Sequence, residues 1–338
     1  MCLERQSTAY KQDKTKLGYC QHSKWFVQNK TQIEEFVTVN TTSIQQTLRK
    51  LDKSFQAFFR RIKQGQKPGY PRFKGQDRFN SVVFILSDGA GIKDERLYIQ
   101  HVGHIKVKWH RELRGTIKSI TIKQSAGNWY VTFCCEVPKP HPLPVTGRIT
   151  GIDVGIESFV TTSEGQQVQT CQPLKKNLKH LRRLQRALSR KKRGSNSRTK
   201  AKHQVVKLYE HVSNTRRDIH HKTARQLVNQ FDKIAVEDLD IKGMLNTSYM
   251  SRMISDSGWG NFLNILTYKA EEAGRLVVKV DPRGTSQQCS QCGTIVQKAL
   301  SCRKHNCTTC GLVLHRDHNA ALNILNRAFK SPEGALVA

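Results

Sequence analysis

The chain is short of acidic residues. Its 338 residues hold 26 Asp and Glu against 57 Lys and Arg, which gives a formal net charge of +31. A folded body with this excess carries a positive field, and nucleic acid is the commonest polyanion that such a field attracts. An anionic membrane surface is the rival partner that charge alone leaves open.

Two further kinds of segment are missing from the sequence. No apolar run approaches the roughly 18 residues of a membrane-spanning helix, and residues 1–23 contain no apolar signal core. Cysteine is not scarce, but half of the ten cysteines crowd into residues 289–310 while the others are scattered. This distribution indicates a reducing compartment and a metal site, and argues against a disulfide framework.

The second half of the chain alternates strand-like and helix-like segments. We expect strands at 148–154, 159–162, 167–170, 233–238 and 276–280, and helices at 259–273 and 318–329. Strands interleaved with helices predict an α/β layered domain.

The first half is patterned differently. Residues 1–40 show only weak periodicity, whereas apolar side chains at steps of three and four predict a helix over 42–62. Short β-branched and aromatic runs punctuated by glycine between residues 80 and 137 predict a small antiparallel β-barrel or sheet, with strands such as 82–85, 105–109 and 129–133. The proline-rich stretch 138–144 then predicts a stiff linker and a domain boundary.

Two basic segments are candidate nucleic-acid contacts. Arg72 and Lys74 are interleaved with aromatics in the stretch 67–74, where base or backbone contact and a proline-stiffened linker are equally good explanations. Leucine seams on either side of Gly194 predict an antiparallel helical hairpin. No acid occurs from residue 165 to 209, and because a solvated face normally mixes signs, a phosphate-backbone contact is favoured. The hairpin cations in question are Lys175, Lys176, Lys179, Arg182, Arg183, Arg186, Arg190, Lys191, Lys192 and Arg193.

Two Cys-x2-Cys pairs near the end of the chain give the strongest local signal. Each pair is followed by a glycine that permits a tight turn, and four thiolates from two such turns are the usual shell of tetrahedral zinc. Cys302 and His305 lie between the pairs and are alternative ligands. Four protein ligands leave no open coordination position, so we predict a structural Zn(II) rather than a catalytic one. The expected ligands are Cys289, Cys292, Cys307 and Cys310.

Three carboxylates stand out in so basic a chain. Asp153 ends one expected strand, Glu237 follows the apolar run 234–236, and Asp317 precedes the last helix. Singly they have ordinary explanations as a turn residue, a surface acid and a helix N-cap. An ionised carboxylate at the edge of an apolar strand is costly unless a cation compensates it, and three acids from separate elements can hold two Mg(II) ions about 3.5–4 Å apart. Together they predict metal-dependent chemistry on a polyanion.

The ordered set of motifs closely resembles the TnpB (OrfB) family of transposon-associated, RNA-guided DNA endonucleases, which is similar to the small type V CRISPR effectors. The resemblance runs from about residue 43 to 329, and although each motif alone is moderately specific, their order is highly specific. The motifs are Gly-Tyr-Pro-Arg-Phe-Lys (69–74), Gly-Ile-Asp-Val-Gly (151–155), the basic hairpin, Val-Glu-Asp-Leu (236–239), Thr-Ser-Gln-Gln-Cys-Ser-Gln-Cys-Gly (285–293), Cys-Thr-Thr-Cys-Gly (307–311) and Arg-Asp-His-Asn-Ala-Ala (316–321).

The resemblance implies a RuvC-type nuclease domain of the ribonuclease H fold, with Asp153, Glu237 and Asp317 as catalytic, Mg(II)-binding residues. Its partners would be guide RNA from the transposon end and a double-stranded DNA target, with guide pairing supplying sequence specificity. The implied location is the prokaryotic cytoplasm, at the nucleoid. The implied organisation is a helical guide- and target-binding module at 1–78, a β-barrel part at 79–138, a linker at 139–147, a nuclease domain at 148–284 with the hairpin inserted at 173–228, a zinc ribbon at 285–315, and the last acid with a C-terminal helix at 316–338.

Family members usually open with a strand and a helix ahead of the region that resembles residues 1–50. The chain is therefore expected to start inside that segment, with impaired binding of guide and target-flanking motif. This expectation keeps a second function open, that of a nucleic-acid-binding regulator or degenerate transposon protein without effective cleavage. A strand-transferring transposase shares the acidic triad but needs no guide-RNA surface, so co-purified RNA separates it from the first reading. The oligomeric state is left open.

Overall fold

The computed structural model describes residues 1–75, 78–247, 249–299 and 301–329. The chain divides into two units, Met1–Pro138 and Lys139–Ala338, called here the N-terminal and C-terminal units. The end of the predicted C-terminal segment, residues 330–338, lies outside the described residues. No helix in the described residues is long and apolar enough to cross a membrane.

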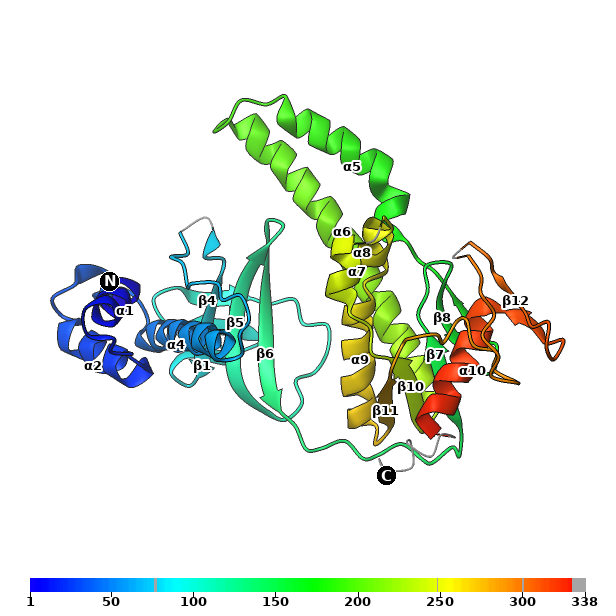
Figure 1. The fold of residues 1–338 in the computed structure, drawn as a ribbon. Coiled ribbons are helices and arrows are strands. Elements are labelled where there is room, and N and C mark those ends of the chain that lie inside the picture. The colour runs from blue at the N-terminus through cyan, green and yellow to red at the C-terminus, as the bar shows by residue number, and fades with distance from the viewer. Residues whose placement is uncertain (76–77, 248, 300, 330–338) are drawn as a thin grey trace. The chain divides into compact units, whose positions relative to one another are not determined.

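The N-terminal unit opens with four helices (Figure 1). They are α1 (Cys2–Asp13), α2 (Tyr19–Asn29), α3 (Glu34–Val37) and α4 (Thr41–Lys63). The predicted helix at 42–62 is α4, whose apolar stripe buries Leu48 and Phe55. The bounds of the three shorter helices were not predicted, because α1 buries only Gln6, α2 buries only His22 and Phe26, and α3 has four residues, so none shows a periodic apolar pattern.

Six strands complete this unit in the order β4-β3-β2-β1-β5-β6. Their bounds are β1 (Ser81–Leu86), β2 (Gly89–Lys93), β3 (Arg96–Ile99), β4 (Gly103–Lys106), β5 (Thr116–Ser125) and β6 (Asn128–Glu136). The prediction of a wholly antiparallel sheet is wrong at one pair, since β1 and β2 run parallel where Ile85 faces Gly89. The expected strand at 105–109 also ends early, at Lys106. Phe84, Leu97 and Ile120 form the buried face.

The C-terminal unit is built on a five-stranded sheet of order β11-β10-β7-β8-β9. The strands are β7 (Ile149–Asp153), β8 (Ser158–Thr162), β9 (Gln167–Gln169), β10 (Lys233–Glu237) and β11 (Leu276–Val280). Strands β7, β10 and β11 are parallel, while β8 and β9 are antiparallel to their neighbours. The strand predictions hold to within two residues at each end; β10 and β11 are short apolar runs, whereas β9 has only Val168 between two glutamines.

Helices cover both faces of this sheet, so the predicted α/β class is confirmed. Ile234 and Val236 face a core that includes Phe262 and Leu266 of α9 (Trp259–Glu272). Ala235 points the other way, against Ile324 of α10 (Arg316–Phe329). Gly151 lets α10 come close to β7, since a Cβ there would lie only 2.3 Å from the Ala321 carbonyl oxygen.

A helical hairpin interrupts the sheet between β9 and β10 (Figure 1). It consists of α5 (Pro173–Ser189) and α6 (Asn196–Gln230), joined through the predicted seam of Leu181, Val205 and Leu208. Two short helices after β10, α7 (Ile241–Thr247) and α8 (Ser251–Ser257), were not predicted. A two-stranded ribbon, β12 (Lys304–Asn306) and β13 (Val313–His315), precedes α10.

Candidate active site and metal centre

Two of the three acids stand side by side at one edge of the sheet. Asp153 ends β7 and Glu237 ends β10, and these strands are parallel with Val236 opposite Ile152. The next residue on each strand is therefore an acid at the same level, which follows from the carboxyl ends of parallel strands sharing one edge.

The third acid comes to this edge from the last helix. Asp317 lies in the first turn of α10, is buried, and has Oδ2 only 3.7 Å from the place where a Cβ on Gly155 would stand. Gly155 is two residues beyond Asp153, so all three predicted acids belong to one neighbourhood. Asp317 is inside the helix rather than capping it, which leaves the N-cap explanation without support.

The electrostatics of this cluster are unfavourable without a cation. Burial raises the pKa of Asp153 well above its usual value, and the charges of Glu237 and Asp317 raise it further. Burial also raises the pKa of Glu237. A divalent cation would relieve both effects, because it removes the cost of burying like charges together. The oxygens do not form one compact shell, since among the described residues only the cysteine group brings three or more ligand atoms within 4.8 Å of one another.

Thr285 holds one of the carboxylates in place. Its hydroxyl donates to Glu237 Oε1 at 2.6 Å, and the residue is 4% exposed. Pro282 also offers its carbonyl oxygen to this hydroxyl at 3.0 Å, so the single proton has two acceptors. Thr285 opens the cysteine-containing motif, and nothing in the local pattern marked it as a partner of Glu237.

With Glu237 as the predicted Mg(II) ligand, we expect Thr285→Val to lower DNA cleavage by about ten- to hundredfold, the usual loss when a group that orients a metal ligand is removed. Because valine keeps the shape but lacks the donor, the variant should also need more Mg(II) for half-maximal rate. Thr285→Ser restores the hydroxyl and is the matched control. A titration of rate against Mg(II) concentration in which valine, serine and wild type coincide would contradict the role of this hydrogen bond.

The four predicted zinc ligands converge on one point. Their sulfurs lie within 4.8 Å of one another, with 3.6 Å between Cys289 and Cys310 and 3.5 Å between Cys292 and Cys307. Four sulfurs at about 2.3 Å from a tetrahedral zinc ion would stand about 3.8 Å apart, so the cluster has the right size and donor type. The pKa of the Cys292 thiol is lowered to about 6, chiefly by its side-chain hydrogen bond with Thr294, whereas the pKa of the Cys310 thiol is raised to about 12. The four thiols therefore need a metal ion to ionise together.

The two turns that carry these cysteines are built alike. Gly293 and Gly311 both have positive φ, and each amide donates to the carbonyl of the first cysteine of its pair. The alternative ligands lie outside the four-sulfur group: Cys302 is exposed and directs its thiol at the Lys304 carbonyl, while buried His305 has Nδ1 2.5 Å from Lys298 Nζ.

Two asparagines of helix α10 form hydrogen bonds with the start of the zinc-ribbon segment 285–315, and the same helix carries Asp317. Asn319 accepts from the Ser290 amide and donates to the Gln288 carbonyl, at 3.0 and 2.8 Å. Asn323 donates to the carbonyls of Gln288 and Thr285, at 2.7 and 2.8 Å. The backbone around Cys289 is thus tied to the helix that carries Asp317.

A second link runs from the ribbon to the same acid. Arg303, just before β12, forms an ion pair with Glu157 at 2.7 Å, and its guanidinium lies 4.0 Å from Asp317 Oδ1. Sequence reasoning missed this arginine and both asparagines. Asn319 lies in the motif Arg-Asp-His-Asn-Ala-Ala (316–321), but no pattern in the sequence marks it as a hydrogen-bonding partner of the zinc ribbon.

The ten hairpin cations are all solvent-exposed, and none of them makes an ion pair with a described carboxylate. The base of the hairpin is fixed by Asp256 of α8, which accepts from the amides of Leu174 and Lys175 and pairs with Arg216. The result is an anchored arm with an unneutralised basic surface.

Arg72 and Lys74 lie in the other unit and are likewise exposed. Tyr70 fixes their segment to α4 by edge-on contacts with Phe55 and Phe58, with ring centroids 5.7 and 5.3 Å apart. Phe73 between the two cations is 77% exposed. The segment is therefore anchored at one point and presents an aromatic ring between two charges.

Two family models match parts of the chain. The family model described as “Probable transposase” (OrfB of IS605) matches residues 132–248, and the model of the Cas12f1-like TNB domain matches residues 259–324. A protein of Escherichia coli (strain K12) named as the RNA-guided DNA endonuclease InsQ is 30% identical, over 96% of this chain and 84% of its own. A Streptomyces pristinaespiralis protein also named as an RNA-guided DNA endonuclease is 30% identical, over 96% and 81%.

CRISPR-associated proteins are also among the similar proteins and solved structures. The endodeoxyribonuclease Cas12f1 of Sulfoacidibacillus thermotolerans is 26% identical, over 58% of this chain and 49% of its own. A solved Cas12f1–sgRNA–target DNA complex aligns with 96% of this chain and 89% of its own at TM-score 0.41 and 16% identity. The class that these matches define is the transposon-associated endonucleases and their CRISPR relatives. Within it, the chain belongs to the TnpB (OrfB) family of RNA-guided DNA endonucleases.

Proposed function

We propose that this chain is an RNA-guided, Mg(II)-dependent DNA endonuclease of a mobile element, with Asp153, Glu237 and Asp317 as its catalytic carboxylates. The observation that carries the proposal is that these acids lie together at the carboxyl ends of β7 and β10. The pKa values of Asp153 and Glu237 are raised there, so their ionised forms are destabilised unless a cation binds beside them. Two relatives that cover most of the chain and are named RNA-guided DNA endonucleases favour this function over a regulator without cleavage.

The sheet supports a ribonuclease H-like, RuvC-type assignment for the nuclease domain. Its order β9-β8-β7-β10-β11, with an antiparallel half and a parallel half meeting at β7, places the acids of β7 and β10 at the central pair. The hairpin at 173–228 and the ribbon at 285–315 are then insertions into this domain, and 139–147 is the linker before it.

The chemistry divides between the metal ions and the chain. Bound Mg(II) supplies water activation and stabilisation of the leaving oxygen. The three carboxylates would hold the ions, while Thr285 orients Glu237 and Arg303 stands beside Asp317. Zinc at the four cysteines has a structural role, since all four ligands come from the protein.

The partners we propose are guide RNA from the transposon end and a double-stranded DNA target. The exposed cations of the α5–α6 hairpin, together with Arg72 and Lys74, would contact phosphates. The N-terminal unit would bind guide and target-flanking motif, while base pairing reads the target sequence.

Replacing Arg182, Arg183 and Arg186 with glutamine should weaken RNA binding and flatten its salt dependence, because each lost phosphate contact removes about 0.7–0.9 from the slope of log K against log salt. The slope is measured by binding titrations over a range of salt concentrations. The control replaces three exposed cations of the same unit that lie outside the hairpin, Lys233, Lys242 and Arg252, with the same loss of charge. Equal slopes for the two triple variants would remove the hairpin from the interface.

The proposed function is tested with the RNA that purifies with the native protein. That RNA is sequenced, its guide segment is replaced, and the complex is challenged with plasmids that carry a matched target beside randomised flanking sequence. We expect Mg(II)-dependent double-strand breaks only at matched targets. Absence of bound RNA, or breaks that ignore the guide, would overturn the proposal.

A further inference from the structure

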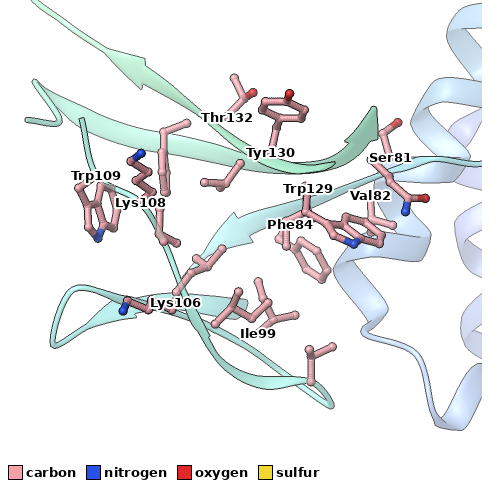
Figure 2. A pocket seen from close by; sticks show the side chains of 18 of the residues that line it. Ser81, Val82, Phe84, Ile99, Lys106, Lys108, Trp109, Trp129, Tyr130 and Thr132 are labelled. Atoms are coloured by element: carbon pink, nitrogen blue, oxygen red, sulfur yellow. The ribbon is translucent and has the colours of Figure 1, made fainter. Parts of the chain in front are cut away.

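The sheet of the N-terminal unit contains a cavity of about 1190 Å³ that the acidic site does not use. Val82, Phe84 and Ile99 line its apolar wall, and the segment that follows β4 closes one side (Figure 2). This volume is larger than that of most small-molecule sites, which span about 300–1,000 Å³. It has room for a planar ring system and more.

One large apolar side chain, Trp129, lies on the inner face of its strand but is exposed rather than buried. Trp129, Val131 and Phe133 alternate along β6 and share its inner face, where Val131 and Phe133 pack against the core. Trp129 is on that inner face yet is 69% exposed. Figure 2 shows its indole on the side of Phe84, with Tyr130 and Thr132 on the opposite side of the strand. A large apolar ring that is directed inward and left uncovered offers a stacking surface.

The opposite wall is rigid. Trp109 stacks on Phe133 with ring centroids 5.4 Å apart, and its Nε1 donates to the Glu95 carbonyl at 2.7 Å. The indole of Trp129, in contrast, has no aromatic neighbour or hydrogen bond in the described part of the chain. Trp109 is therefore held in place by its neighbours, whereas the indole of Trp129 is accessible to a ligand that stacks on it.

The charge of the lining identifies the kind of ligand. Three cations, Lys106, Lys108 and Arg111, border the cavity, and among the described lining residues none is acidic. Polar groups that can meet the edge of a base also reach it, from Asn80, Ser81 and Gln124. Aromatic rings for a base beside cations for its phosphate are the combination that binds single-stranded nucleic acid.

We propose that this cavity, through Trp129, captures an unpaired base of the guide RNA. The proposal rests on the proposed function for its choice of RNA. The bases of a double-stranded target are paired when the protein meets them, whereas a guide RNA offers unpaired bases from the start. The ring of the base stacks on Trp129, and its phosphate lies near Lys106 and Lys108.

The test uses the full chain with a short oligouridylate that carries one 4-thiouridine, and with an oligothymidylate that carries 4-thiothymidine. Light-induced crosslinks are mapped by mass spectrometry, and affinity is measured by anisotropy. We expect the oligouridylate to crosslink at Trp129 or the 106–111 segment. Trp129→Ala should bind it about tenfold more weakly, the weight of one stacked base, while Trp129→Phe should keep most of the affinity.

Tyr249, which is 82% exposed in the other unit, supplies the control: Tyr249→Ala should bind as the wild type does. Lys108→Glu is a second variant, which changes an exposed cation of the cavity rim and leaves the core unchanged. It should abolish the crosslink, because it places a negative charge where the phosphate is expected to lie. Crosslinks confined to the α5–α6 hairpin, or unchanged affinity in Trp129→Ala, would overturn the proposal. Preferential crosslinking of the oligothymidylate would overturn the choice of RNA. A protein that crosslinks at Trp129 but never cleaves DNA would support the cavity and reject the nuclease, and one that cleaves without this crosslink would do the reverse.

Discussion

Asp153→Asn is expected to lower guided DNA cleavage by about a thousandfold. Metal-ion stabilisation of the transition state is worth several kcal/mol, and each 1.4 kcal/mol is about a factor of ten in rate. The amide keeps the size of the side chain but is a much weaker ligand for Mg(II). The measurement is single-turnover cleavage of a matched target at saturating Mg(II), with RNA binding followed in parallel to show that the complex still forms.

Stability separates loss of a metal ligand from loss of the fold. The folded-state pKa of Asp153 is raised, so between the ordinary carboxyl pKa and the raised one the folded protein holds a proton that the unfolded chain has released. Metal-free wild type is thus destabilised as pH rises from the ordinary carboxyl pKa through the raised one. Asp153→Asn removes that penalty, and at neutral pH the metal-free variant should unfold at the same temperature as wild type or higher. Mg(II) should stabilise wild type more than the variant.

The control for this prediction is the acid beside Glu237. Asp238 is exposed and pairs with Lys279 at the surface, so Asp238→Asn should change the cleavage rate by no more than about twofold. If Asp153→Asn cuts as fast as Asp238→Asn, the carboxylate at the end of β7 is not catalytic.

Removing zinc should have the second-largest effect, a fall in cleavage of about a hundredfold, although zinc does not touch DNA. Binding of structural zinc contributes about 10–16 kcal/mol to the folding of zinc-finger peptides, so the ribbon should unfold once Cys289 is replaced by alanine. Asn319 and Asn323 would then lose their hydrogen-bond partners at Gln288 and Ser290. Thr285, on the same segment, would no longer hold Glu237.

Three measurements check this chain of effects. Zinc content should fall from one ion per chain to none, hydrogen exchange should rise across the ribbon and the first turn of α10, and cleavage should fall with Mg(II) in excess. Cys302→Ala is the matched control, because this exposed cysteine lies outside the four-sulfur group and should keep both zinc and rate. Zinc-free protein that cuts at the full rate would separate the ribbon from the acids.

The sequence was sufficient wherever a feature is written in consecutive residues. Strands β10 and β11 are apolar runs, Asp153 and Glu237 each end a short buried strand, and the spacing of the cysteines indicates their metal site. The contacts that hold the acids in position were out of reach. The Thr285 to Glu237 bond joins residues 48 apart in the chain, and the Arg303 contact needs the ribbon and α10 to be placed first.

The helices that sequence reasoning missed share a physical cause. Helices α7 and α8 have seven residues each, too few for a periodic stripe, yet α8 supplies the Asp256 that fixes the hairpin. In the N-terminal unit, α1 and α2 bury polar side chains such as Gln6 and His22, which no hydrophobic pattern can indicate.

The position of α10 after the ribbon also sets an order in time. A ribosome makes Asp153 long before Asp317, and at about 5–20 residues per second the interval is on the order of ten to thirty seconds. The N-terminal unit is already made when that interval begins and the basic hairpin is made within it, whereas the acidic cluster lacks its third member until the interval ends. The basic surfaces proposed to contact RNA are therefore complete before the proposed catalytic cluster is.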